Sequence, residues 1–296
     1  MGIDRVSFGA NKWKFYKTLK KWKVTDLILC GVLFLANIPI YYQKPFERQF
    51  YVNDLTISHP FAEVETVNNN ALMVYSYFVP LFTIILFSLL LADHKHRWYL
   101  MYISMVGLTV TWLTTSLLTN YLKNWIGRHR PDFLARCIPR PSTPLNTLVY
   151  AADVCTTTNF DLLYDGFRTT PSGHSSESFA GLGFLFFWLC GQLLTEFPET
   201  GSWRKTLACL PLVGATVIAL SRTEDYRHHF VDVILGSTLG FVLSHWSYRR
   251  YFPSIQSNLP FKPLLDDSDV VLEEYIQVRP TTEEELFPVS RTTDSS

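Results

Sequence analysis

The chain has 296 residues, of which 48% are hydrophobic and 15% aromatic, and its 26 basic side chains balance 26 acidic ones. This length would allow one or two soluble domains, but the apolar residues are gathered into long uncharged runs, which the core of a soluble helical protein does not need. A formal net charge of zero points to no class of partner, because the charges are segregated along the chain rather than pooled.

The first 23 residues are polar and basic. They show no cleavable signal peptide and place seven Lys or Arg side chains before the first apolar run. Excess positive charge beside a membrane span favours the cytosolic side. We therefore expect residues 1–23 to form a basic cytosolic segment that carries Arg5, Lys12, Lys14, Lys17, Lys20, Lys21 and Lys23.

Six segments are predicted to cross a membrane. Runs of about 18 or more uncharged, apolar residues are typical of membrane spans, and the second, third and fourth segments contain no charged residue. The predicted fold is an all-α integral membrane protein with a six-span domain over residues 24–250 and its catalytic motifs at helix ends on one membrane face. The six segments are Val24–Tyr42, Leu72–Ala92, Trp98–Leu122, Ser178–Thr195, Thr206–Ser221 and Phe230–Tyr248.

An even number of spans returns the C-terminal side to the cytosol. Arg249 and Arg250 directly after the last span agree with this orientation, as does the basic turn Lys95–Arg97 between the second and third spans. The loops after spans one, three and five are then expected to face away from the cytosol. Residues 251–296 are rich in Asp and Glu, and we expect them to form a mostly disordered, cytosolic tail.

The five cysteines divide by position. Cys30, Cys190 and Cys209 fall inside predicted spans, where packing is the expected role. Cys137 and Cys155 share one non-cytosolic loop, where a disulfide and two free thiols are equally compatible with the sequence. The chain contains no Cys-x-x-Cys pair or Cys/His cluster with the spacing of a metal site.

The glycines of the fourth span and the loop between the first two spans are expected to have structural roles. Gly181 and Gly183 in the fourth span are expected to permit close helix packing. Residues 43–71, between the first two spans, are expected to cap the helices, and nothing in their sequence supports a role as a lid or substrate entry.

The third span ends in a basic motif, Lys123 to Pro131. Lys123 and Arg130 are seven residues apart, so a continuous helix would point both to one side, where two cations suit an anionic group. Lys and Arg also snorkel at membrane interfaces without any further function, but this end is on the predicted non-cytosolic side, where positive charge is unusual. Arg128 and His129 lie off this stripe and are expected at the surface.

A second motif, Pro171 to His174, directly precedes the fourth span. Pro171 and Gly173 set a turn, and the free N–H groups that open the following helix favour an anion. The Ser172 hydroxyl either caps this helix or donates to a phosphate oxygen, and His174 beside a bound anion suits a general acid. An ordinary helix cap with an incidental histidine is the structural alternative.

The third motif, Ser221 to Asp232, precedes the sixth span. A helix that begins near His228 would put His228 and Asp232 on one face, where the carboxylate holds one ring nitrogen and leaves the other free as a nucleophile or metal ligand. Arg222 offers a planar fork of donors for a phosphate. The structural alternative is a polar helix start whose charges are solvated.

Together the three motifs predict phosphoryl transfer. They supply cations to surround the phosphoryl oxygens, a histidine to attack in line and a second histidine to protonate the leaving oxygen. No further carboxylate cluster is available to hold Mg²⁺, so the cations would take the place of a metal, and no cofactor is expected.

The motifs Lys-x6-Arg-Pro, Pro-Ser-Gly-His and Ser-Arg-x5-His-x3-Asp resemble the three signatures of the type 2 phosphatidic acid phosphatase superfamily. The chain is also similar over most of its length to fungal diacylglycerol pyrophosphate phosphatases, through Phe46–Phe50, Asp54–Pro60 and Pro260–Leu264. This resemblance implies Mg²⁺-independent hydrolysis of diacylglycerol pyrophosphate to phosphatidate and of phosphatidate to diacylglycerol. It implies His228 as nucleophile, Asp232 as its orienting partner and His174 as acid, with the phosphoryl oxygens held by Lys123, Arg130, Ser172, Gly173 and Arg222.

Other functions stay open at this stage. A sphingoid-base or polyprenyl phosphate phosphatase would keep the mechanism and change the substrate, because the motifs recognise phosphate and not the lipid tail. A membrane transporter or scaffold is an alternative of another class. The expected partners are a lipid phosphate substrate and the bilayer, with no nucleic acid and no obligate protein partner, and the resemblance suggests the vacuolar membrane or another endomembrane.

Overall fold

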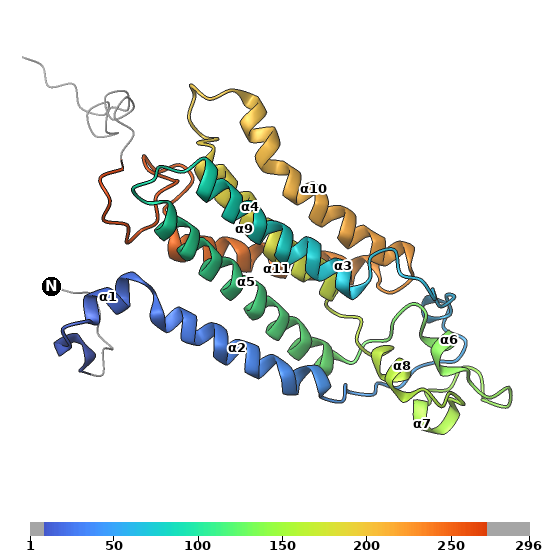
Figure 1. Cartoon of the computed structure of the whole chain (residues 1–296). Coiled ribbons are helices and arrows are strands. Elements are labelled where there is room, and N and C mark those ends of the chain that lie inside the picture. The colour runs from blue at the N-terminus through green and yellow to red at the C-terminus, as the bar shows by residue number, and fades with distance from the viewer. Residues whose placement is uncertain (1–8, 271–296) are drawn as a thin grey trace, which may run out of the picture.

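A computed structural model describes residues 9–270, and within this range the chain is helical and forms no strand (Figure 1). Two isolated β-bridges, Phe50 to Val149 and Pro139 to Cys155, are its only extended pairings in the described range. The elements are η1 (Ala10–Lys12), α1 (Tyr16–Lys21), α2 (Val24–Tyr42), η2 (Leu55–Ile57), α3 (Asn69–Met73), the π-helical turn η3 (Val74–Phe78), α4 (Val79–Leu90), α5 (Arg97–Ile126), α6 (Phe133–Cys137), α7 (Ala151–Val154), α8 (Phe160–Asp165), α9 (Gly173–Gln192), α10 (Ser202–Glu224) and α11 (Phe230–Tyr251).

Every predicted span is helical. Between residues 9 and 270, five helices are long and apolar enough to cross a membrane: α2, the continuous α3–η3–α4 segment Asn69–Leu90, α5, α10 and α11. The fourth predicted span corresponds to α9, whose first turns carry the polar residues His174 to Glu177 and lower its mean hydropathy. The chain is therefore an all-α, multi-pass protein, and the crossing of the membrane by α9 stays a prediction.

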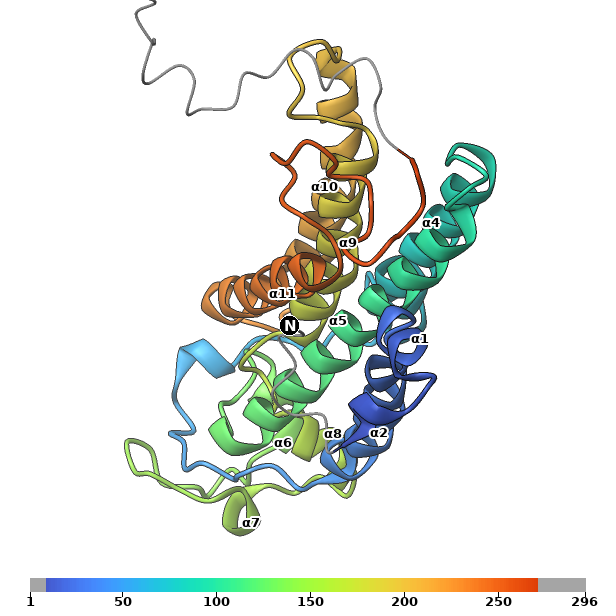
Figure 2. The same cartoon turned by 90° about the vertical axis from the view of Figure 1, so that its left-hand side faces the viewer.

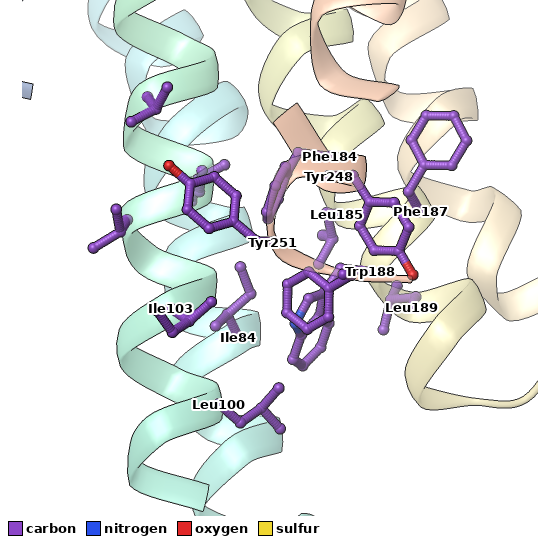
Figure 3. Packing of buried hydrophobic residues seen from close by; sticks show 14 of the residues in the cluster. Ile84, Leu100, Ile103, Phe184, Leu185, Phe187, Trp188, Leu189, Tyr248 and Tyr251 are labelled. Atoms are coloured by element: carbon purple, nitrogen blue, oxygen red, sulfur yellow. The ribbon is translucent and has the colours of Figure 1, made fainter. Parts of the chain in front are cut away.

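Helix α9 is the centre of the bundle, and 15 of its 20 residues are buried. It packs against α10, α11 and α5. Trp188, on α9, is fully buried and donates its indole N–H to the Ser104 hydroxyl of α5 over 2.8 Å. Figure 3 shows Phe184, Trp188 and Tyr248 gathered between α9, α11 and α5. By contrast, α2 has only two buried residues, as expected for a helix that faces lipid.

Glycines allow the helices around α9 to approach closely. A Cβ atom at Gly181 would lie 1.6 Å from the carbonyl oxygen of Ser76, and one at Gly183 would lie 2.7 Å from the Ser244 hydroxyl. The prediction that these two glycines permit close packing is confirmed. Helix α11 approaches the other side of α9 through Gly240, where a Cβ would lie 2.1 Å from the carbonyl oxygen of Ser176.

One end of the bundle carries a small extramembrane layer. Helices α6, α7 and α8 lie there together with the loop that follows α2 (Figures 1 and 2). Phe50, Ile57, Phe133 and Phe167 form an apolar cluster within this layer, and the Cys137–Cys155 disulfide joins α6 to the end of α7. Of the two states compatible with the sequence, the structure therefore contains the disulfide.

The opposite end is closed by residues 252–270. These residues, predicted to belong to a mostly disordered tail, instead fold back onto the bundle. Asp266 pairs with the ring of His96 at 3.1 Å, and both side chains are buried. The carbonyl oxygen of Phe261 accepts a hydrogen bond from Gln192 at the end of α9. Residues 252–270 thus pack against the bundle, and residues 271–296 lie outside the described residues.

Candidate active site

The three sequence motifs meet at the end of the bundle that carries α6, α7 and α8. Lys123 is in the last turns of α5, Gly173 opens α9, and Asp232 is in the first turn of α11. A Cβ at Gly173 would lie 3.1 Å from Nζ of Lys123, which joins the first motif to the second. The backbone N–H of Ser172 donates to the carbonyl oxygen of Asp232 over 3.0 Å, which joins the second motif to the third.

Ser172 caps α9, which is one of the two roles that its sequence left open. Its backbone is extended, and its hydroxyl oxygen accepts from the N–H and the hydroxyl of Ser175. This capping arrangement satisfies a donor that would otherwise be orphaned at the helix start. His174 then follows in the first turn of α9 and is 7% exposed.

His228 is almost completely buried in the loop that joins α10 to α11. Its backbone N–H donates to the carbonyl oxygen of Arg222, and α11 begins only at Phe230. The prediction that His228 shares a helix face with Asp232 is therefore wrong. The helix starts later because His229 adopts extended backbone geometry and serves as its N-cap.

The ring of His228 is held by Thr169, not directly by a carboxylate. Its Nδ1 lies 2.7 Å from the carbonyl oxygen of Thr169 and 3.2 Å from the hydroxyl of the same residue. Because a carbonyl oxygen only accepts, Nδ1 carries the proton and Nε2 carries the lone pair. The sequence analysis expected a carboxylate to hold one ring nitrogen, but the backbone carbonyl of Thr169 holds it instead.

Asp232 acts on His228 through Thr169. It is fully buried, and its carboxylate accepts hydrogen bonds from the hydroxyls of Thr169 and Thr170, at 2.8 and 2.5 Å, and from the backbone N–H of His229. The last of these bonds belongs to the capping box of α11, because Asp232 is the third residue of that helix. The carboxylate therefore fixes the segment that in turn holds His228.

Three cations surround His228: Lys123, Arg130 and Arg222, called the site cations below. Burial lowers the pKa of His228 well below its ordinary value, and Arg130, Lys123, Arg222 and His174 lower it further. Such electrostatic coupling requires proximity. The contacts agree: Arg130 donates to the carbonyl oxygen of Arg227, next to His228, and Arg222 and His174 share the Val67 carbonyl oxygen. The site cations and both histidines therefore belong to one cluster.

Arg130 reaches this cluster from a loop and not from a helical stripe. Helix α5 ends at Ile126, because Gly127 adopts a left-handed conformation with φ of 60°. Arg130 then donates its Nε and Nη2 to the backbone and carboxylate oxygens of Asp165, at 2.9 and 2.8 Å. Burial lowers the pKa of Arg130 to about 10, so it stays a cation at neutral pH.

Comparison with known proteins agrees with this geometry. Residues 98–256, which include every site residue named so far, match the family model described as PAP2 superfamily. The chain belongs to the PAP2 superfamily. It is thus a PAP2 phosphatase and a multi-pass membrane protein.

Several curated relatives carry informative names. The chain is 60% identical to "Diacylglycerol pyrophosphate phosphatase 1" of Saccharomyces cerevisiae, over 97% of this chain and 99% of the relative. It is 42% identical to "Probable diacylglycerol pyrophosphate phosphatase 1" of Schizosaccharomyces pombe, over 71% of this chain and 74% of that protein. It is 32% identical to "Probable lipid phosphate phosphatase 4" of Arabidopsis thaliana, over 78% and 75%. No solved structure matches the chain.

Two residues of the first PAP2 motif do not lie where the sequence analysis expected. Arg128, predicted at the surface, is partly exposed but pairs with Asp232, with Nη1 at 2.9 Å from Oδ1. His129 is 7% exposed and packs against Phe50, Phe133 and Phe167. Both predictions assumed that the α5 helix continues past Gly127. The helix instead ends at Ile126, and in the following loop the two side chains point toward the protein.

The PAP2 site also includes residues that the sequence analysis missed. The loop that follows α2 brings Glu65 and Val67 onto the cluster. The carbonyl oxygen of Val67 accepts from Nε2 of His174 at 2.9 Å and from Nη1 of Arg222 at 3.1 Å. Glu65 pairs with Nη2 of Arg222 at 3.0 Å. This loop is more than 100 residues from either partner in sequence, and no local pattern links them.

The described residues offer no evident metal centre. Between residues 9 and 270, no group of three His, Cys, Asp or Glu side chains lies close enough together to hold a metal ion. Carboxylates beside the cluster, such as Glu65, Asp165 and Asp232, are instead bonded to arginines and hydroxyl groups.

Proposed function

We propose that this PAP2 protein hydrolyses diacylglycerol pyrophosphate to phosphatidate and phosphatidate to diacylglycerol, without a divalent metal ion, through a phosphohistidine on His228. The observation that carries the proposal is a buried imidazole with Nδ1 bonded to the Thr169 carbonyl and three cations around it. Near-full-length similarity to a yeast protein named for this substrate supports the choice of lipid.

In the first step, the lone pair on Nε2 of His228 attacks phosphorus. The N–P bond forms as the bond between phosphorus and the leaving oxygen breaks, and that oxygen takes a proton from His174. His174 acts in its doubly protonated form, which the negative charge of the bound substrate favours. Its Nε2 donates to the Val67 carbonyl oxygen over 2.9 Å, so the proton transferred to the leaving oxygen is the one on Nδ1. The second step is attack of water on the phosphohistidine, with the proton of water passing to His174, which releases phosphate and restores both rings.

The site cations would stabilise the charge that develops on the phosphoryl oxygens. Preorganised donors in a buried site contribute more than they do in water, because they need no reorganisation during the reaction. The free backbone N–H of Gly173, at the start of α9, adds a further donor of the type that binds phosphate at helix N-termini. The proposal therefore assigns phosphate binding to Lys123, Arg130, Gly173 and Arg222, and gives Ser172 the role of holding the Gly173 turn.

We further propose that the site faces the lumen of the vacuole or of another endomembrane compartment. The disulfide Cys137–Cys155 lies at the same end of the bundle as the site, and disulfides persist in oxidising compartments. The basic segment before α2 lies at the opposite end, which agrees with a cytosolic N-terminal side. The proposal requires no protein partner.

The experiment that tests the proposal is phosphate release from defined lipids by purified protein, with and without EDTA. We expect release from diacylglycerol pyrophosphate and phosphatidate that EDTA does not diminish, and a loss of at least about 10³-fold for His228→Ala. A strong preference for a sphingoid-base or polyprenyl phosphate would overturn the substrate assignment, and retained turnover by His228→Ala would overturn the mechanism. His94→Ala is the matched control, since its ring is 78% exposed in the turn before α5.

A further inference from the structure

The loop between α2 and α3 contributes a carboxylate that binds two arginines beside the cluster. Glu65 accepts a hydrogen bond from Nη2 of Arg222 through one oxygen, at 3.0 Å, and forms an ion pair with Nη2 of Arg227 through the other, at 3.1 Å. Arg222 belongs to the third motif, whereas Arg227 directly precedes His228. A single side chain thus joins the last turn of α10 to the loop that presents the nucleophile.

Both arginines are buried and depend on nearby acceptors. Arg222 is 1% exposed and Arg227 is 5% exposed, whereas a quarter of the Glu65 side chain is exposed. A buried guanidinium without an anionic or hydrogen-bonding partner carries a large desolvation cost. Since Glu65 neutralises part of this charge on both residues, its loss would leave them free to take other rotamers.

The segment that carries Glu65 is itself held in place. Asp225 accepts from both the backbone N–H and the hydroxyl of Thr66, at 3.0 and 2.8 Å, and from Nη1 of Arg222 at 3.1 Å. The carbonyl oxygen of Ala62 accepts from Nη2 of Arg227. The contact between the loop and the arginines is therefore a network of bonds from several successive residues and not a single surface ion pair.

These contacts leave one nitrogen of Arg222 available. Both of its Nη atoms are bonded to Glu65, Val67 and Asp225. Its Nε is buried and has no hydrogen-bond partner among residues 9–270. Because the fork is planar and its other end is anchored, the direction of the Nε–H bond is fixed. This N–H, together with the second N–H of Nη2, can be offered to a phosphoryl oxygen without breaking an existing bond.

We propose that Glu65 is a positioning residue of the active site, which holds Arg222 and Arg227 so that the Nε–H of Arg222 meets the transferred phosphoryl group. This inference rests on the proposed function. Glu65 lies outside residues 98–256, the part of the chain that matches the PAP2 family model. The loop after α2 therefore adds an element to the site that the three motifs do not contain.

The test compares Glu65→Gln and Glu65→Asp with the matched control Glu63→Gln. Glu63 is exposed on the same loop and forms no ion pair within the described residues. We measure kcat and KM on diacylglycerol pyrophosphate, and the inhibition constant of orthovanadate, an anion that reports on the phosphoryl site. For Glu65→Gln we expect kcat to fall about 10²-fold, since a displacement of about 1 Å costs this much, with KM changed less than about threefold.

Three further outcomes complete the test. The orthovanadate inhibition constant should rise about tenfold in Glu65→Gln, Glu65→Asp should recover part of kcat, and Glu63→Gln should match the wild type. Unchanged kcat and orthovanadate inhibition in Glu65→Gln would overturn the inference. So would a loss of activity explained wholly by unfolded protein, with normal orthovanadate inhibition in the remainder. Wild-type protein that hydrolyses no lipid phosphate would refute the proposed function instead, and a thermal shift with orthovanadate would still test Glu65.

Discussion

The contact between α11 and α9 at Gly240 can be tested by substitution, because it lies within the N-terminal halves of the two helices that carry the second and third motifs. A Cβ atom at Gly240 would sit 2.1 Å from the carbonyl oxygen of Ser176 and 2.9 Å from the backbone nitrogen of Ala180. Both neighbours are backbone atoms of α9 and cannot rotate away. In Gly240→Ala the two helices must separate by about 1 Å to restore an ordinary contact.

That separation should affect activity more than stability. Overpacking of this kind typically costs about 1–3 kcal/mol, which a bundle of this size can survive. His174, however, is only two residues from Ser176 on α9, whereas His228 is attached to the start of α11. A shift of about 1 Å between the two rings should lower kcat about 10²-fold.

The assay is phosphate release from diacylglycerol pyrophosphate by purified Gly240→Ala, with thermal unfolding measured on the same preparation. Gly31→Ala is the control, because Gly31 lies in the middle of α2 and a Cβ there would meet no atom within 4 Å. We expect this control to keep its activity. The reasoning fails if Gly240→Ala keeps the kcat of the wild type, or if Gly31→Ala loses activity to the same degree.

Three further predictions follow from the site. Burial and the site cations lower the pKa of His228 below its ordinary value of 6.5, so its Nε2 keeps the lone pair as the pH falls through 6.5. The midpoint of the acid limb in a plot of kcat/KM against pH should therefore lie below pH 6.5. A midpoint at or above pH 6.5 that is assigned to His228 would contradict this. Removing the disulfide in Cys155→Ser should lower the free energy of unfolding by about 3 kcal/mol, because it closes a loop of 18 residues, as measured by unfolding beside Cys209→Ser. Arg128→Gln should lower kcat about tenfold and less than Asp232→Asn does, because the carboxylate keeps its other hydrogen bonds; equal losses would refute this order.

The helices of this fold could be predicted because their signal is local. A run of uncharged, apolar residues long enough to span a bilayer has few other structures available to it, and Val24–Tyr42 coincides with α2. The helix ends were less certain. The chain stops α5 at Gly127, a residue that commonly ends helices in a left-handed conformation. Gly127 therefore indicates a helix end before Arg130, and Lys123 and Arg130 are not expected on one face of a continuous helix.

The partners of the catalytic residues could not be predicted, because they come from distant parts of the chain. Thr169 and Thr170 lie more than 60 residues from Asp232, and Glu65 lies 157 residues from Arg222. No periodicity connects such positions, and only the packing of α9 against α11 and the path of the loop after α2 bring them together. The motifs thus contain the proposed reacting groups, whereas tertiary structure supplies the groups that orient them.

The charges around the site explain why its supporting carboxylates come from outside the long helices of the bundle. Each buried arginine at this end needs an anion in the resting protein, and Asp165 and Glu65 supply one to Arg130 and Arg222. An incoming phosphoryl group brings its own negative charge, so the carboxylates must neutralise the cations without blocking the face that binds phosphate. Glu65 meets this requirement, because it binds Nη2 of Arg222 and leaves the Nε–H without a partner among the described residues. Carboxylates within the cluster itself would instead repel the substrate.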